Sequence, residues 1–235
     1  MAGKGRSIDT PLSRRDVAIG LAVLPFAACQ PAPRSPPNPR ENTARPVAAP
    51  DPAALVELVK LDPEIHLDIR YATPNNFTGT QLYDEPRAFL VGVAAQALVR
   101  VQAAAWADGY GLLIYDAYRP WQITKKLWDM TPPEKRSFVA NPKEGSRHNR
   151  GCAVDLTLYD RTTGNAVTMP SGYDEFSKRA YRDYPGGSVQ ETASRARLER
   201  YMEAEGFSGI SNEWWHFDYK DWARYPILDV PFSRI

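Results

Sequence analysis

The sequence predicts an α+β fold, a single domain in which helices pack on a central, mostly antiparallel sheet. Stretches that alternate apolar and polar residues, as strands do, mix irregularly with helical stretches and do not repeat as the strand–helix–strand units of a parallel sheet. The chain has 235 residues, 43% of them hydrophobic, which suits one buried core but is short for two substantial domains. Its two cysteines are too few for a disulfide framework.

The first part of this domain is predicted to be extended and then helical. Residues 55–71 are largely extended, and Leu67, Ile69 and Tyr71 alternate with polar neighbours as in a half-buried strand. Residues 87–108 predict the clearest helix of the chain. They are rich in alanine, contain no proline and are followed by a glycine, which commonly ends a helix.

Five further elements complete the prediction. A short apolar strand is predicted at 111–115, where it ends before a proline turn, and a helix is predicted at 121–130. Residues 152–159 alternate like a strand. A helix at 191–205 is followed by a glycine, and an aromatic strand follows at 214–219.

The N-terminal residues have the features of an export signal. Arg14 and Arg15 precede an apolar run at 17–28, which is too short to span a membrane as a mature helix and is typical of a signal peptide. The arginine pair resembles a twin-arginine signal. Phe26-Ala27-Ala28-Cys29 resembles the lipobox at which bacterial lipoproteins are cleaved and lipidated. The alternative is a disordered N-terminus with a chance arginine pair and an inert cysteine.

The next segment is predicted to be a tether. Residues 30–50 carry seven prolines among polar residues and cannot bury enough apolar surface to fold. We therefore expect a signal peptide at 1–29, a proline-rich linker at 30–50 and a folded domain at 51–235. The protein would then be exported to the periplasm or cell envelope, and it would contact the membrane only through a lipid anchor at Cys29.

The charge of the chain excludes nucleic-acid binding as its main function. The formal net charge is +1, and the first fifty residues hold seven basic and three acidic residues. The remainder therefore carries 22 basic and 25 acidic residues and is mildly acidic. Proteins that bind nucleic acid need a basic surface, which this domain does not offer.

Two of the three histidines stand where a metal site is plausible from the chemistry. His148 precedes Asp155 by seven positions, and a loop that bends at Gly151 and enters a strand could bring both side chains to one point. His216 is the third candidate. Histidine nitrogens and aspartate oxygens bind catalytic zinc, and three protein ligands leave a fourth position for water. His66 lies in a predicted strand and is expected to be structural.

Two charged residues suit the chemistry around such a metal. Glu213, three positions before His216, could take a proton from the water as general base. Residues three apart on an ideal strand face opposite sides, so this role requires a bend or loop near Glu213. Arg119 could face the oxyanion that forms when hydroxide attacks a carbonyl. The alternative for Arg119 is a structural ion pair with Asp116.

Five short segments of the domain occur together in a known family. They are Leu67-Asp68-Ile69-Arg70-Tyr71-Ala72-Thr73, Asn76-Phe77-Thr78-Gly79, Asp116-Ala117-Tyr118-Arg119-Pro120, Ser-x-His-x-x-Gly-x-Ala-x-Asp at 146–155, and Glu213-Trp214-Trp215-His216-Phe217. In this order they resemble the VanX-type D-alanyl-D-alanine dipeptidases, which are M15 zinc peptidases. The resemblance covers residues from about 55 to 232, and the combination is highly specific although each segment alone is weak.

The resemblance implies a fold, a cofactor and a reaction. The fold would be the α+β domain of these zinc peptidases, with one zinc ion per chain held by His148, Asp155 and His216. Glu213 would be the general base on zinc-bound water, and Arg119 would stabilise the oxyanion. Zinc lowers the pKa of its water from about 16 to about 7 in well-known cases.

The implied partner is a small D,D-dipeptide, D-alanyl-D-alanine, which would be cleaved to free D-alanine. Asp174 matches an acidic residue that holds the ammonium of the substrate, and Ser146 and Tyr71 match positions that line the same pocket. Cys152, beside the metal motif, is expected to be a packed side chain rather than a ligand. Two alternatives stay open: a D,D-carboxypeptidase or endopeptidase acting on longer peptidoglycan peptides, and a non-catalytic wall-binding lipoprotein. The oligomeric state is not predicted.

Overall fold

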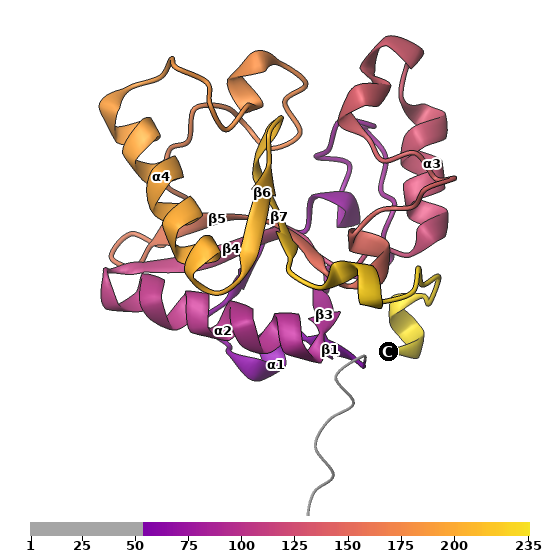
Figure 1. The fold of residues 1–235 in the computed structure, drawn as a ribbon, viewed down its shortest axis with the longest axis horizontal. Helices are drawn as coiled ribbons and strands as arrows, with labels where there is room; N and C mark the ends of the chain where they lie inside the picture. The colour runs from indigo at the N-terminus through magenta and orange to yellow at the C-terminus, as the bar shows by residue number, and fades with distance from the viewer. Residues whose placement is uncertain (1–53) are drawn as a thin grey trace, which may run out of the picture. The chain divides into compact units, whose positions relative to one another are not determined.

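A five-stranded sheet runs through the residues that the computed structural model describes, 54–235 (Figure 1). Its strand order is β2-β4-β5-β7-β6, and only the β2–β4 pair is parallel. The strands are β2 (His66–Leu67), β4 (Tyr110–Asp116), β5 (Ala153–Asp160), β6 (Phe207–Ile210) and β7 (Glu213–Tyr219). The predicted α+β class with a mostly antiparallel sheet is confirmed. The predicted signal peptide, the linker and Cys29 lie outside the described residues.

Four α-helices of residues 54–235 lie around this sheet (Figure 1). They are α1 (Leu58–Leu61), α2 (Gly92–Ala107), α3 (Trp121–Met130) and α4 (Val189–Ala204). α3 has the predicted bounds, since it follows Pro120 and ends before two prolines. α4 begins two residues before the predicted start because Ser188 and Glu191 form a capping box. None of the helices in residues 54–235 is long and apolar enough to cross a membrane.

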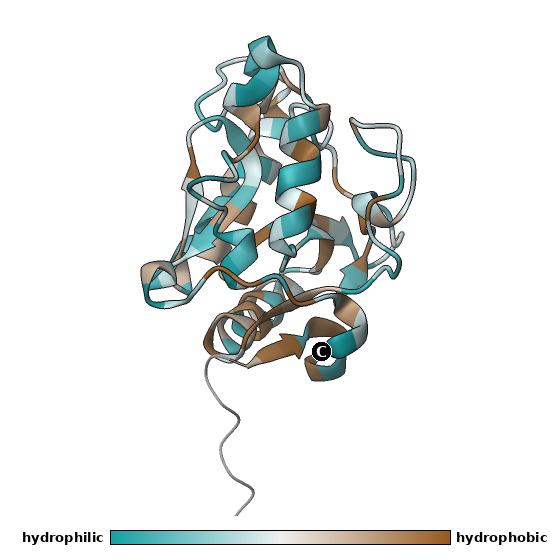
Figure 2. Ribbon diagram, turned by 90° about the vertical axis from the view of Figure 1, so that its right-hand side faces the viewer, coloured by the Kyte–Doolittle hydropathy of each residue, from teal (hydrophilic) through white to brown (hydrophobic). Residues whose placement is uncertain are grey.

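Short 3-10 helices and a second sheet complete the fold. The 3-10 helices are η1 (Arg70–Ala72), η2 (Pro133–Phe138), η3 (His148–Arg150), η4 (Lys178–Ala180), η5 (Trp222–Arg224) and η6 (Phe232–Arg234). The second sheet pairs β1 (Leu55–Glu57) with β3 (Phe89–Val91) in antiparallel fashion. Figure 2 shows that hydrophobic residues concentrate in the lower part of the molecule, where this pair and α2 lie.

The two faces of the main sheet differ in polarity. Leu112 and Ile114 of β4 lie opposite Leu158 and Leu156 of β5, so the four side chains share one face, and all are fully buried. α2 packs against β4 and lies beneath β4 and β5 in Figure 1. Because side chains alternate along a strand, Asp155 occupies the other face of β5.

The ladder between β5 and β7 is short. Only three residue pairs join the two strands, at Ala153, Val154 and Asp155 of β5. The last of these pairs sets Asp155 directly opposite His216. Cross-strand neighbours lie on the same face of a sheet, so the backbone itself brings these two side chains together.

The predicted helix at 87–108 is partly wrong at its N-terminal end. α2 begins only at Gly92, whose N–H donates to the carbonyl of Ala54 at 3.1 Å. The preceding apolar residues form β3 instead, and each is at most 1% exposed. A short apolar run has the same appearance in a buried helix and in a buried strand, so its pattern does not separate the two.

The predicted strand through Leu67, Ile69 and Tyr71 is also shorter than expected. β2 ends at Leu67, and the chain then turns through η1, which buries Tyr71. The side chain of Asn76 stabilises this turn, since its Nδ2 lies 2.7 Å from the carbonyl oxygen of Thr73. Ile69 and Tyr71 are therefore buried at a helical turn and not along an extended strand.

Candidate metal centre

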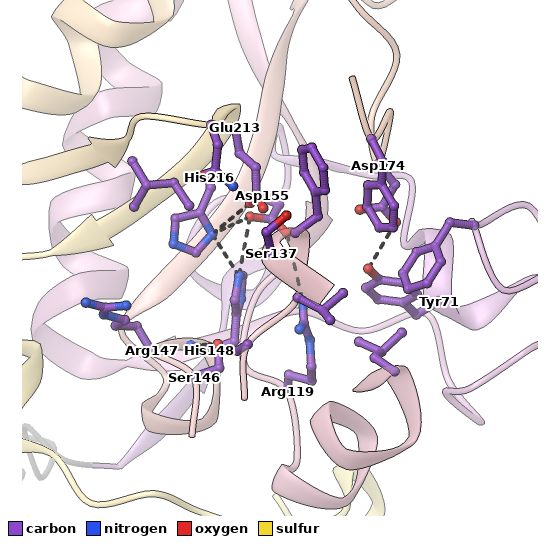
Figure 3. Close-up of a pocket in the computed structure, with 18 residues that line it drawn as sticks. Tyr71, Arg119, Ser137, Ser146, Arg147, His148, Asp155, Asp174, Glu213 and His216 are labelled. Carbon is purple, nitrogen blue, oxygen red and sulfur yellow. Dashed lines mark hydrogen bonds and ion pairs between the residues drawn. The ribbon is translucent and has the colours of Figure 1, made fainter. Parts of the chain in front are cut away.

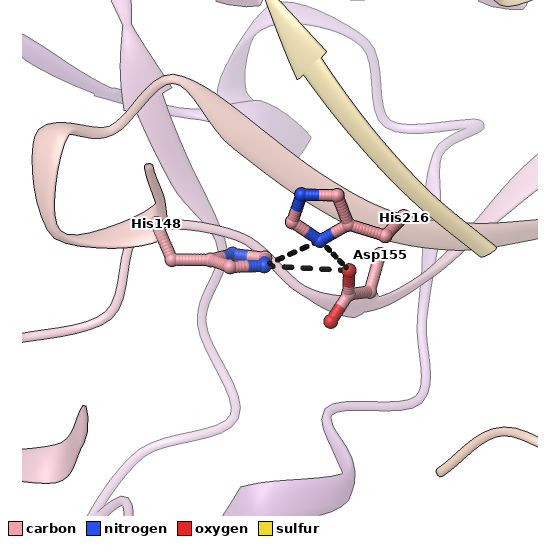
Figure 4. A group of neighbouring side chains, drawn as sticks. All are labelled: His148, Asp155 and His216. Carbon is pink, nitrogen blue, oxygen red and sulfur yellow. Dashed lines mark hydrogen bonds and ion pairs between the residues drawn. The ribbon is translucent and has the colours of Figure 1, made fainter. Parts of the chain in front are cut away.

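The three predicted metal ligands converge at one point of the structure. His148 comes from η3, Asp155 from β5 and His216 from β7 (Figure 4). Asp155 Oδ1 lies 2.9 Å from His216 Nδ1 and 3.3 Å from His148 Nε2. The two imidazole nitrogens are 3.1 Å apart. All three side chains are buried, so the cluster is a prepared site and not a chance meeting on the surface.

Local backbone geometry explains this convergence. Gly151 adopts the left-handed conformation, with φ of 63°, and ends the turn that carries His148. The chain then enters β5 and reaches Asp155, which is paired with His216 across the ladder. The predicted bend at Gly151 is therefore present, and it joins a side chain in a turn to two on neighbouring strands.

The outer nitrogen of each imidazole has a partner of its own. His148 Nδ1 lies 2.7 Å from the carbonyl oxygen of Ala117, and His216 Nε2 lies 3.0 Å from Asp218 Oδ1. Each outer nitrogen meets an acceptor and must donate to it, which leaves a lone pair on each inner nitrogen. Two lone pairs facing each other at 3.1 Å need a cation or a proton between them. Two imidazoles and one carboxylate oxygen, held from behind in this way, suit zinc.

The charge around His216 favours a cation. Burial lowers the pKa of His216, but hydrogen bonds to the carboxylates of Asp155 and Asp218 outweigh it and raise the pKa to about 10. The two carboxylates beside His216 therefore favour a positive charge at this point of the cluster.

The bend that Glu213 required is a shift of register between β6 and β7. Gly209 pairs with Phe217, whereas the next residue, Ile210, pairs with Glu213, so β7 carries extra residues at this point. Glu213 consequently points toward the metal cluster, with Oε2 3.9 Å from His216 Nδ1. Burial, supported by the charge of Asp155, raises the pKa of Glu213 to about 7. A carboxyl with such a pKa can both take and return a proton near neutrality.

Arg119 takes part in the ion pair that the sequence left as an alternative. Its Nε and Nη2 lie 2.9 Å and 2.7 Å from Asp116 Oδ2, and both side chains are buried. Tyr83 donates to the other oxygen of Asp116 at 2.7 Å. Arg119 nevertheless lines the cavity beside the metal cluster. The ion pair therefore fixes a guanidinium at the cavity wall, and the two interpretations are compatible.

The predicted substrate-binding residues lie around the same cavity (Figure 3). Tyr71 donates to Asp174 Oδ2 at 3.0 Å, and Asp174 has an unusual positive φ of 57°. Burial, together with the negative charge of Asp155, raises the pKa of Asp174 well above its usual range. Ser146 Oγ accepts the backbone N–H of His148 at 3.2 Å and so supports the turn that carries this histidine.

The cavity has a volume of about 220 Å³. Ser146 and Arg147 lie toward one side of the metal cluster in Figure 3, and Tyr71 and Asp174 lie toward the other. Three phenylalanines for which the sequence predicted no role in the site form part of the wall. They are Phe77, Phe138 and Phe176, with Phe138 and Phe176 stacked at 4.9 Å.

Two further polar residues contact the cluster, and neither was predicted from the sequence. Asp218, which holds His216, has a signal in the sequence: it stands two positions later on a predicted strand and therefore on the same side. Tyr173, which donates to Asp155 Oδ2 at 3.0 Å, has no comparable signal because it comes from a loop. The contact joins residues 18 positions apart, and loop conformation sets it.

Two residues with reactive side chains lie apart from the cluster. His66 stacks on Tyr159 with ring centroids 3.9 Å apart, as suits the structural role predicted for it. Cys152 is fully buried, and burial raises the pKa of its thiol to about 12. Within residues 54–235 it is not one of the grouped metal-binding side chains.

Comparison with known proteins identifies relatives of this chain. The family model Peptidase_M15, described as D-ala-D-ala dipeptidase, matches residues 51–233. A D-alanyl-D-alanine dipeptidase of Escherichia coli (strain K12) is 38% identical over 183 residues, covering 78% of this chain and 93% of the relative. A D-alanyl-D-alanine dipeptidase of Enterococcus faecium is 35% identical over 178 residues, covering 67% and 87%.

Solved structures are more distant. The vancomycin resistance D,D-dipeptidase VanXYg, solved in complex with a D-Ala-D-Ala phosphinate analog, is 18% identical with a TM-score of 0.36. The match covers 71% of this chain and 66% of that one.

Proposed function

Because the chain belongs to the Peptidase_M15 family of D-Ala-D-Ala dipeptidases, we propose that it hydrolyses D-alanyl-D-alanine to two molecules of D-alanine in a zinc-dependent reaction. The observation that carries this proposal is the meeting of His148, Asp155 and His216 at the wall of a cavity that Glu213 and Arg119 also line. A hydrolase needs these functions in one place.

The three buried ligands are the residues that would hold the zinc ion. Bound there, zinc would supply a low pKa for the attacking water and a Lewis acid for the carbonyl oxygen. Asp218 and the carbonyl of Ala117 keep the two imidazoles in the tautomers that this role requires.

Glu213 transfers the proton in this reaction, and Arg119 stabilises the negative charge that forms. Glu213 takes a proton from the attacking water as the water oxygen forms its bond to the peptide carbonyl carbon. Arg119, fixed by Asp116, donates to the carbonyl oxygen as it becomes negative. Glu213 then returns the proton to the leaving nitrogen as the carbon–nitrogen bond breaks, so the residue ends the cycle as it began.

Charge places the ammonium end of the dipeptide, and the size of the cavity bears on the length of the substrate. Asp174, with Oδ2 held by Tyr71, would bind the free ammonium, whose positive charge favours the ionised carboxylate and so opposes the effect of burial on its pKa. Ser146 lines the cavity beside the metal ligands. The cavity of about 220 Å³ is smaller than the roughly 300–1,000 Å³ typical of ligand pockets. This size favours a dipeptide over the longer wall peptides of a carboxypeptidase.

A panel of alanine dipeptides tests the proposal. The purified protein, loaded with zinc, should cleave the D,D isomer much faster than the L,D and L,L isomers, and a chelator should abolish the activity. A wall pentapeptide ending in D-Ala-D-Ala should be cleaved poorly. Preferential cleavage of the pentapeptide would establish the carboxypeptidase alternative. Zinc binding without cleavage of any of these peptides would favour the non-catalytic one.

We further propose that the protein acts outside the inner membrane, lipid-anchored at Cys29 after export. The arginine pair, the short apolar run and the cysteine after Ala27-Ala28 support this proposal. An exported enzyme has no access to cytoplasmic D-alanyl-D-alanine, so its role would be salvage or remodelling of D-amino-acid dipeptides. Membrane fractionation of the tagged protein should recover it in the membrane, and Cys29→Ala should release it. Recovery of the native protein from the cytosol would refute the proposal.

A further inference from the structure

Tyr173 contacts Asp155, one of the three candidate metal ligands. Its hydroxyl donates to Asp155 Oδ2 at 3.0 Å. Among the residues that the structure describes, Tyr173 is not one that lines the cavity, and its polar contact is with the carboxylate of Asp155. The hydroxyl therefore acts on a metal ligand and not on the reacting groups.

The two oxygens of Asp155 have different surroundings. Oδ1 faces both imidazoles, at 2.9 Å from His216 Nδ1 and 3.3 Å from His148 Nε2. Oδ2 accepts the hydrogen bond from Tyr173 and lies 4.0 Å from Arg119 Nη2. A carboxylate that is free to rotate can offer either oxygen, or both, to a metal ion. Here a hydrogen bond holds Oδ2 away and leaves Oδ1 to point at the imidazoles.

The ring of Tyr173 is itself fixed by packing. It stacks on Tyr115 with ring centroids 4.7 Å apart, and it meets Trp215 edge-on at 5.3 Å. The next residue in the chain is Asp174, in its positive-φ conformation. Tyr173 thus supports the candidate metal ligand Asp155, and its neighbour Asp174 presents a carboxyl group to the cavity.

We propose that Tyr173 is a positioning residue that restricts Asp155 to binding the metal through Oδ1 alone. This inference rests on the proposed function in that it takes Asp155 to be a zinc ligand. Hydrogen-bonding partners of ligating groups commonly contribute 10–100-fold to metal affinity or activity. Removal of the hydroxyl should therefore weaken zinc binding and lower kcat, while the ring keeps Asp174 in place and KM stays nearly constant.

The experiment compares Tyr173→Phe with a matched control, Tyr115→Phe. Tyr115 belongs to the same aromatic stack, but its hydroxyl makes no hydrogen bond to Asp155 among the contacts of residues 54–235. Zinc affinity is measured by competition with a chromophoric chelator. We expect zinc binding to weaken about 10-fold or more in Tyr173→Phe and to change less than about twofold in Tyr115→Phe.

Cobalt(II) in place of zinc reports on coordination directly. If Oδ2 is released in Tyr173→Phe, it can join Oδ1 as a ligand, and the visible absorption of cobalt should weaken because absorption falls as coordination number rises. Tyr115→Phe should keep the wild-type spectrum. These measurements need no substrate, so they separate the role of Tyr173 from the identity of the reaction.

Two results would overturn the inference. Wild-type zinc affinity and kcat in Tyr173→Phe would show that the hydroxyl does not position Asp155, and equal losses in both variants would assign the effect to aromatic packing. If the wild type binds zinc but cleaves no dipeptide, the proposed function fails, whereas the comparison of zinc affinities still decides the role of Tyr173.

Discussion

Glu213 shows how a single side chain acquires its role from the backbone beneath it. The register shift between β6 and β7 turns it toward His216, and burial raises its pKa to about 7. We predict that Glu213→Gln, which keeps the shape but cannot take a proton, lowers kcat at least about 100-fold. Zinc content and zinc affinity should stay at the wild-type level. Turnover close to wild type in the zinc-loaded variant would remove Glu213 from the role of base.

Asp116 is predicted to stabilise the fold through Arg119. Both side chains are buried, and Asp116→Asn would leave the buried guanidinium without its nearest counter-charge, with only Asp155 Oδ2 at 4.0 Å. Loss of one partner of a buried ion pair typically costs about 3–5 kcal/mol. We expect a decrease of about that size in the free energy of unfolding, measured by urea denaturation, together with a lower kcat. Asp68→Asn, which breaks the more exposed pair with Arg70, is the control and should cost less than about 1 kcal/mol.

At this scale the sequence predicted the three candidate metal ligands, which the structure brings together, but not the residues that hold them in place. His148, Asp155 and His216 carry recognisable chemistry at a spacing shared with a known family. Tyr173 and Asp218 are ordinary residue types whose importance lies in where their polar atoms end up. Only the folded structure sets these distances, although the alternation of a strand would have pointed to Asp218.

The elements around the metal cluster maintain its geometry, and the turn at Gly151 is the clearest example. A Cβ on this residue would lie 2.6 Å from Leu55 Cδ2 and 3.2 Å from the backbone nitrogen of Val91, at a φ of 63°. We predict that Gly151→Ala costs at least about 2 kcal/mol of stability and weakens zinc binding by displacing His148.

Gly164→Ala is the matched control for this substitution. Gly164 has a similar φ of 72°, but a Cβ there would meet no atom within 4 Å. The cost should be about 1 kcal/mol from the backbone alone, with zinc affinity unchanged. Equal effects of the two substitutions on both measurements would mean that the crowding at Gly151 does not support the cluster.

The β1–β3 pair is predicted to make folding sensitive to acid. Glu57 on β1 accepts two hydrogen bonds from Arg87, at 2.8 Å and 2.9 Å, which together with Lys60 lower its pKa from 4.5 to about 2. The ionised carboxylate therefore stabilises the fold above about pH 4.5, and this contribution disappears as the pH falls through about 2. We expect Glu57→Gln to lose on the order of 2 kcal/mol at pH 7.

Urea unfolding at a series of pH values measures this contribution. The difference in free energy of unfolding between wild type and Glu57→Gln should be constant above pH 5 and shrink steadily towards pH 2. A difference that is independent of pH would assign the effect of the substitution to shape and not to charge.

Element boundaries could be predicted only where a local residue decides them. α3 follows a proline and precedes two, and its bounds were predicted correctly. The start of α2 depends on the pairing of β3 with β1, which lies more than 30 residues away in the chain. The register shift near Glu213 is likewise a property of two paired strands. A pattern within one segment does not contain such information.

For the molecule as a whole, zinc should act as a structural ligand as well as a catalytic one. A ligand that binds only the folded state at about 100 times its Kd stabilises it by about 2.7 kcal/mol. For a domain of this size, that corresponds to an increase in Tm of roughly 5–10 °C. Thermal unfolding with added zinc and with a chelator should show this difference. In His216→Ala the difference should vanish, and an undiminished shift there would locate the bound zinc elsewhere.

The cavity lies where the short β5–β7 ladder ends. Pairing stops at Asp155 and His216, so β5 and β7 separate beyond this pair, and the candidate metal ligands lie where the two strands part. The loops around the cavity could therefore vary between related proteins while the paired strands that bring Asp155 and His216 together stay the same.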